Sequence, residues 1–117
     1  MALTYLKAKV SNLKDPKKSI ERRFLVDSGA VYSVIDAKVL KKLGIKPHSK
    51  RHFLLANGDE IEKEIGDAFF VYGEQKASAP VIFGDKDIFL LGATTLENLG
   101  LILNPIDREL RPLPMVI

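Results

Sequence analysis

The chain has 117 residues, a formal net charge of +3 and no cysteine. This length fits one domain, which we assign to residues 1–117, and a hydrophobic content of 46% is enough for a packed core. The lack of cysteine excludes disulfides and thiolate metal sites and favours a reducing, cytoplasmic setting. The mild, scattered charge gives no argument for nucleic acid, and neither a signal peptide nor a membrane-spanning apolar run is present, so we expect no membrane partner.

The first third of the chain has the pattern of strands separated by turns. Residues 3–10 and 20–26 are predicted strands, joined by a polar connection that contains Pro16. The end of the second strand is apolar on both faces, as expected of an enclosed strand. After it, residues 30–35 are again β-like.

A short helix follows at Asp36. Asp is a favourable N-cap residue, and the next residues place aliphatic side chains on one face and lysines largely on the other. Gly44 suits the left-handed position that ends a helix, and Pro47 prevents its resumption.

The middle of the chain predicts two hairpins. Residues 51–55 and 61–72 read as strands, the second interrupted at Gly66, and Asn57-Gly58 between them is a strong hairpin signal because both residues tolerate positive φ. A further hairpin is expected at residues 71–77, with residues 80–83 returning.

The last third predicts one more enclosed strand, a second helix and a final hairpin. Residues 88–91 form the strand, and Thr94 or Thr95 is expected to cap a helix that ends at Gly100. A turn at residues 104–107 joins two short strands, and the proline-rich apolar tail, residues 112–117, suits an edge or an interface.

The two halves of the chain repeat one pattern. Residues 24–30 and 88–93 are each an apolar strand that ends in Gly-Ala, and each is followed by a short helix that ends in Leu-Gly. The repetition predicts a pseudo-twofold domain in which two similar loops cross near the centre. Asp27 stands in the first half with no acidic counterpart in the second. A site that needs two carboxylates must therefore take the second from another copy of the chain.

At these residues the chain resembles the retropepsin-like aspartic proteases, the single-domain, dimeric branch of the aspartic proteases. The resemblance extends over residues 6–113 and is of the cellular or prokaryotic type. Its motifs are Val26-Asp27-Ser28-Gly29-Ala30, the hairpin tip Ala56-Asn57-Gly58, and Leu90-Leu91-Gly92 followed by Leu96-Glu97-Asn98-Leu99-Gly100.

The resemblance implies a mainly β, closed barrel-like acid protease fold with two short helices and pseudo-twofold halves. It implies a homodimer that hydrolyses polypeptides bound in extended form, without a cofactor or metal. Asp27 of each subunit would form the catalytic pair, and Ser28 would hydrogen-bond across the dimer. The implied loop support comprises Ser28, Gly29, Ala30 and Gly92. The implied substrate-binding residues are Gly29, through its carbonyl, Val31, Tyr32 and Leu90, and the implied flap comprises Ala56, Asn57, Gly58, Asp59 and Glu60.

The chemistry explains why such a site needs two acids. Two carboxylates in contact cannot both ionise readily, so they share a proton, as is known for aspartic proteases. One then acts as general base on a water molecule while the other donates to the peptide carbonyl.

Two other functions stay open. The chain could be a non-catalytic retropepsin-fold module for peptide binding or dimerisation, or an RNA-binding β-barrel with a contact near Arg22 and Arg23. His48 and His52 have the spacing of a helical metal pair, but the expected strand around them argues against metal binding.

Overall fold

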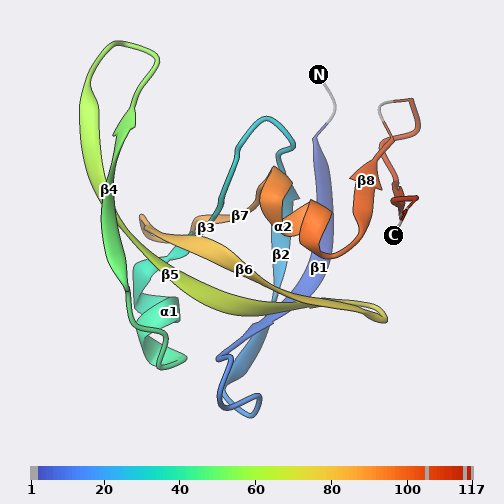
Figure 1. Cartoon of the computed structure of the whole chain (residues 1–117), viewed down its shortest axis with the longest axis horizontal. Helices are drawn as coiled ribbons and strands as arrows, with labels where there is room; N and C mark the ends of the chain where they lie inside the picture. Colours follow the sequence, from blue (N-terminus) through green and yellow to red (C-terminus); the bar gives the residue numbers. More distant parts are fainter. Residues whose placement is uncertain (1–2, 105, 115, 117) are drawn as a thin grey trace.

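A computed structural model describes residues 3–104, 106–114 and 116 (Figure 1). Its elements in chain order are β1 (Thr4–Ser11), β2 (Ser19–Val26), β3 (Ser33–Asp36), α1 (Ala37–Lys42), β4 (Ser49–Leu54), β5 (Glu60–Tyr72), β6 (Gln75–Gly84), β7 (Phe89–Leu91), α2 (Ala93–Asn98), β8 (Leu101–Leu103) and β9 (Leu110–Pro112). Parts of the predicted final turn and tail, residues 105, 115 and 117, lie outside the described residues. Neither helix in the described ranges is long and apolar enough to cross a membrane.

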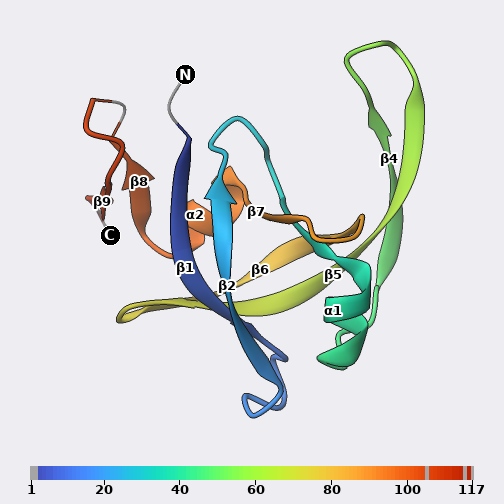
Figure 2. The ribbon, with the colours of Figure 1, turned by 180° about the vertical axis from the view of Figure 1, so that it is seen from behind.

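The strands form a closed barrel with one projecting hairpin. The sheet order is β1-β2-β7-β3-β6-β5-β4, and pairing of β1 with β5 closes the ring before β4. Strand β4 pairs with β5 outside the ring and extends from the barrel, while β8 and β9 form a separate two-stranded ladder (Figures 1 and 2). The predicted mainly β, barrel-like fold with two short helices is confirmed.

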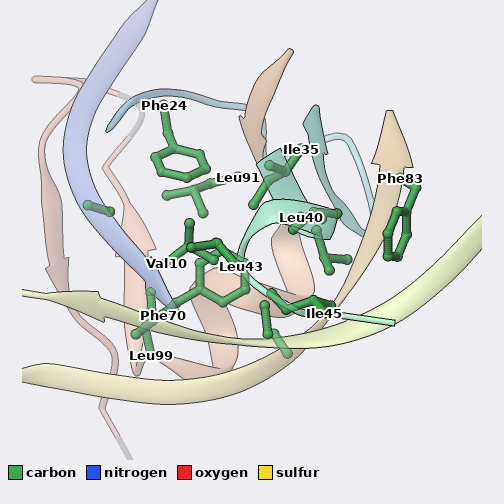
Figure 3. Close-up of a cluster of buried hydrophobic side chains, with 14 of the residues drawn as sticks. Val10, Phe24, Ile35, Leu40, Leu43, Ile45, Phe70, Phe83, Leu91 and Leu99 are labelled. Carbon is green, nitrogen blue, oxygen red and sulfur yellow. The ribbon is translucent and has the colours of Figure 1, made fainter. Parts of the chain in front are cut away.

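The core fills the barrel with aliphatic and aromatic side chains (Figure 3). Phe24 has no exposed surface, and its ring packs edge-on against Phe70 at 6.4 Å and Phe89 at 5.8 Å between centroids. Burying one such side chain contributes about 1.5–3 kcal/mol. Ile35 and Leu91, also fully buried, come from the two strands that flank the crossing described below. The core thus fixes the strands that lead into this crossing.

The two helices end in the same way, as the repeated sequence pattern predicts. The backbone N–H of Leu43 donates to the carbonyl four residues earlier at 3.0 Å, and that of Leu99 does the same at 2.9 Å. Gly44 and Gly100 then take φ values of 76° and 74°, which side chains other than glycine disfavour.

Two strand predictions were wrong. Residues 30–32 form a loop rather than the start of β3, because the carbonyls of Ala30 and Val31 accept hydrogen bonds from the start of α2 instead of from a neighbouring strand. Gly66 does not interrupt β5, since it pairs in register with Val81. A Cβ there would lie 2.9 Å from the carbonyl oxygen of Lys46, so the strand needs a glycine at this close approach.

The predicted threonine cap of α2 was also wrong. Gly92 occupies the N-cap position and no side chain caps this helix. Thr95 is fully buried instead, and its hydroxyl lies 2.5 Å from that of Ser33.

Asp36, by contrast, caps α1 as predicted and also joins a distant loop. Its Oδ1 accepts from the N–H of Lys38 at 2.8 Å and its Oδ2 from the N–H of Asp87 at 2.9 Å. The N–H of Asp87 is the largest cause that holds the pKa of Asp36 below its ordinary value, although burial acts in the opposite direction. Because the charged form is favoured in the folded state, this contribution is complete above the ordinary pKa and is lost as the pH falls through the lowered one.

We therefore expect Asp36→Asn to lower stability near neutral pH. The amide oxygen of asparagine can still cap the helix, but the amide nitrogen that replaces Oδ2 cannot accept the hydrogen bond from the N–H of Asp87. The difference from the wild type should shrink as the pH falls below about 3.8, the ordinary pKa of this carboxyl group. Urea unfolding at pH ~6 and pH ~3 measures it. Asp85→Asn, at a side chain that is 86% exposed, is the matched control; a pH-independent loss in Asp36→Asn would contradict this account.

Candidate active site

Asp27 lies where β2 leaves the barrel. Its backbone N–H donates to the carbonyl of Leu91 at 2.9 Å, which extends the parallel pairing of β2 and β7 by one hydrogen bond. Its Oδ1 accepts from the N–H of Gly29 at 3.0 Å. The side chain is half-buried, while Ser28 and Gly29 are exposed. Asp27 is therefore fixed by backbone groups and still reaches solvent.

Two backbone hydrogen bonds join the loop after Asp27 to the start of α2. The carbonyl of Ala30 accepts from the N–H of Ala93 at 2.7 Å, and the carbonyl of Val31 accepts from that of Thr94 at 3.0 Å. The predicted loop residues Ala30 and Gly92 are thus brought together, and the two halves of the chain cross here.

Gly92 allows this crossing because it has no side chain. A Cβ would lie 2.5 Å from the carbonyl carbon and oxygen of Tyr32 and 2.9 Å from the carbonyl oxygen of Ala30. The N–H of Gly92 donates to Oγ of Ser33 at 3.0 Å.

Ser33 and Thr95 are support residues that the sequence analysis missed. Both are fully buried, and their hydroxyls meet at 2.5 Å behind the crossing. The available signal was local: Thr95 lies four residues before Leu99, on the apolar face of its helix, where a capping residue would not lie. Two polar side chains on otherwise buried faces suggest that they satisfy each other.

The predicted substrate-binding residues differ in exposure. Val31 is 62% exposed, and Tyr32 and Leu90 are half-buried. Leu90 pairs in register with Leu25 of β2. A pocket of about 230 Å³ is lined by Leu25, Leu90, Ile88, Phe89, Tyr5, Arg23 and Asp87.

A second pocket lies directly beside the carboxylate. It has a volume of about 290 Å³ and is lined by Asp27, Ser28, Leu3, Leu25, Val26, Leu103 and Arg108. A larger pocket of about 460 Å³ lies elsewhere, beside Ile45 and His48, and does not include Asp27. We place the candidate site at the Asp27 carboxylate, because backbone hydrogen bonds from both halves of the chain meet at this residue and the loop after it.

The predicted flap is the tip of the β4–β5 hairpin. Residues 56–60 are all exposed, Gly58 has φ 92°, and the side-chain oxygen of Asn57 accepts from the N–H of Asp59 at 2.9 Å. The hairpin tip and the loop after β2 lie toward the same side of the molecule (Figures 1 and 2). Arg51 of β4 donates from Nη1 to the Tyr32 hydroxyl at 2.5 Å, so the hairpin contacts the loop that follows Asp27.

His48 and His52, for which the sequence argued against metal binding, have different carboxylate neighbours. Nε2 of His48 lies 3.3 Å from Asp67, and Nε2 of His52 lies 3.4 Å from Glu62.

Comparisons with known proteins show which fold and family this barrel has. The solution structure of the simian foamy virus (mac) protease is similar to this chain, with a TM-score of 0.59 and 19% identity over 80% of this chain and 92% of that one. A family model described as aspartyl protease matches residues 8–95. The chain belongs to this family, and the resemblance to retropepsin-like proteases is confirmed. A comparison with curated proteins finds no match.

We expect Gly92→Ala to destabilise the protein by about 1–3 kcal/mol, because the added methyl group must displace the carbonyl of Tyr32. Urea unfolding measures the loss. Gly58→Ala is the comparison, since that glycine has an unfavourable φ for alanine but open space around its Cβ position. Wild-type stability in Gly92→Ala would show that the crossing tolerates a side chain.

Ser33→Ala should destabilise by about 1–3 kcal/mol, because it leaves the N–H of Gly92 and the hydroxyl of Thr95 without their buried partner. Thr95→Val keeps the side-chain shape and should cost less. The double variant should be less destabilised than the sum of the two, as expected for coupled groups. Additive losses in unfolding experiments would argue against a shared network.

Proposed function

We propose that this chain is an aspartic endopeptidase that works as a homodimer, with Asp27 of each subunit forming the catalytic pair. The observation that carries the proposal is the position of Asp27: backbone hydrogen bonds fix it at the crossing of the two halves, yet its carboxylate stays half-exposed. Membership of the aspartyl protease family supports peptidase activity in general.

One chain supplies half of the required chemistry. In the described ranges, the hydrogen-bond partners of Asp27 are backbone groups of Leu91, Gly29 and Ala30. The second half of the repeat contributes the Leu91 carbonyl and Gly92 where a second acid would be needed. A partner's Asp27 would complete the pair, so that one carboxyl group acts as base on water while the other donates to the peptide carbonyl.

The surface beside Asp27 suits a symmetric partner. Leu3 is 62% and Ile102 49% exposed, and Leu3 lines the open pocket that also contains Asp27 and Ser28. The start of β1, the loop of residues 27–32 (here the catalytic loop) and β8 lie toward one side of the molecule (Figures 1 and 2). In a twofold contact the same patch is used by both copies, so two Asp27 loops would face each other there. We assign Ser28 to a hydrogen bond across this contact.

We further propose that the substrate is a polypeptide segment bound in extended form under the flap, residues 56–60. An extended segment can pair with exposed backbone groups, which gives affinity without a fixed sequence. The exposed Gly29 would offer its carbonyl, and Val31, Tyr32 and Leu90 would contact side chains of the substrate.

The first test is Asp27→Asn, which we expect to keep the fold and lower cleavage of an unfolded protein by at least about 100-fold, because general acid and base catalysis are both lost. Cleavage is followed by gel electrophoresis and the fold by circular dichroism. Unchanged cleavage would end the proposal. Intact peptide binding in the wild type without turnover at any pH would favour the non-catalytic module instead.

The second test asks whether one site uses two chains. Excess Asp27→Asn protein mixed with the wild type should lower activity in proportion to mixed-dimer formation, because a mixed dimer holds a single Asp27 carboxylate. Asp15→Asn, in the turn between β1 and β2, is the matched control and should not inhibit. Activity that is unaffected by excess Asp27→Asn would show that each chain works alone.

A further inference from the structure

Arg51 lies on the face of the flap hairpin that is directed toward the catalytic loop. It is opposite Lys63 in the β4–β5 register, and directly opposed residues project from the same face of a sheet. Its neighbours along β4 project to the other face, where Lys50 and His52 lie 3.9 Å and 3.4 Å from the carboxylate of Glu62.

Tyr32 holds the Arg51 guanidinium in place. Nη1 of Arg51 donates to the tyrosine hydroxyl at 2.5 Å, and the guanidinium carbon lies 5.6 Å from the centroid of the tyrosine ring. Tyr32 follows Asp27 by five residues and belongs to the loop attached to α2. The positive charge is therefore positioned by the catalytic loop itself.

The charge of Arg51 is not neutralised within the described residues. Lys63 on the same face is paired with Asp85 at 3.2 Å, whereas Arg51 makes no ion pair with a carboxylate in the described ranges. In those ranges its hydrogen-bond acceptor is the hydroxyl of Tyr32. A guanidinium carries five N–H donors in a fixed plane that matches a carboxylate, so donors are left for a ligand.

We propose that Arg51 is a specificity-determining residue that selects substrates with an aspartate or glutamate side chain near the scissile bond. This inference rests on the proposed peptidase function and names its substrate class. An extended segment between the flap and the catalytic loop directs alternate side chains to each face. A side chain on the face of Tyr32 meets the fixed guanidinium, where a carboxylate is favoured over an amide or an ammonium group.

The experiment begins with a synthetic peptide library, read both by cleavage with the wild type and by binding to Asp27→Asn protein, that reveals the residue preferred at each substrate position. Two peptides that differ only by Glu or Gln at the acid-preferring position are then compared. We expect the wild type to have a kcat/KM up to about fivefold higher for the Glu peptide, which corresponds to the upper range for one exposed ion pair. Arg51→Met should bring the ratio close to one, Arg51→Glu should favour a Lys peptide, and Lys50→Met, on the opposite face, should keep the wild-type ratio.

Binding separates this inference from the proposed function. The same two peptides are titrated onto Asp27→Asn protein and onto Asp27→Asn with Arg51→Met. Tighter binding of the Glu peptide that is lost with Arg51 supports the inference even if cleavage fails, in which case the peptidase proposal alone is overturned. Two outcomes would overturn the role of Arg51. One is that the wild type cleaves the two peptides equally and Asp27→Asn binds them equally. The other is an acid preference that survives Arg51→Met.

Discussion

The approach of Gly92 to the loop carrying Asp27 is the contact on which the site depends. Because Gly92 has no side chain, the carbonyls of Ala30 and Tyr32 can lie against it, and the N–H groups of Ala93 and Thr94 can reach the loop. Strands β2 and β7 then run parallel up to Asp27. This crossing holds Asp27 with backbone hydrogen bonds, one of which runs from the N–H of Gly29 to its Oδ1, while the side chain stays half-exposed.

The polar groups behind the crossing show how the barrel tolerates such a tight junction. A buried N–H without a hydrogen-bond partner destabilises the fold, and so does a buried hydroxyl without one. Ser33 accepts from Gly92 and shares a hydrogen bond with Thr95, so the three groups satisfy one another. Asp36 plays a comparable part at the other end of β3, where it joins the start of α1 to Asp87. The short strand between the two halves is thus fixed by polar contacts at both ends and by Ile35 in the core.

Local sequence patterns were enough to predict the parts of the structure that local forces decide. The ends of both helices follow from Leu-Gly and a left-handed glycine, the flap hairpin from Asn57-Gly58, and the position of Asp27 from an apolar strand that stops at an acid. The errors concern residues whose partners are distant in sequence. Thr95 meets Ser33 from 62 residues away. Helical periodicity could place Thr95 on the apolar face of α2 but could not identify its partner in β3, and the threonine was assigned to a cap. The contact of Arg51 with Tyr32 could not be predicted for the same reason.

The β4–β5 flap hairpin has a well-packed base in the barrel and a projecting part with few buried side chains. From Ile65 onward β5 belongs to the barrel, where Ile65, Ala68 and Phe70 are buried, whereas none of its first five residues is buried and most of β4 is exposed. Regions with few buried contacts open at lower free energy than the core, so the hairpin can move while its base stays fixed. The Arg51–Tyr32 hydrogen bond connects this exposed part to the catalytic loop. In the complex proposed above, a substrate carboxylate would use the same guanidinium, so substrate recognition and the position of the hairpin relative to Asp27 would be coupled through Arg51.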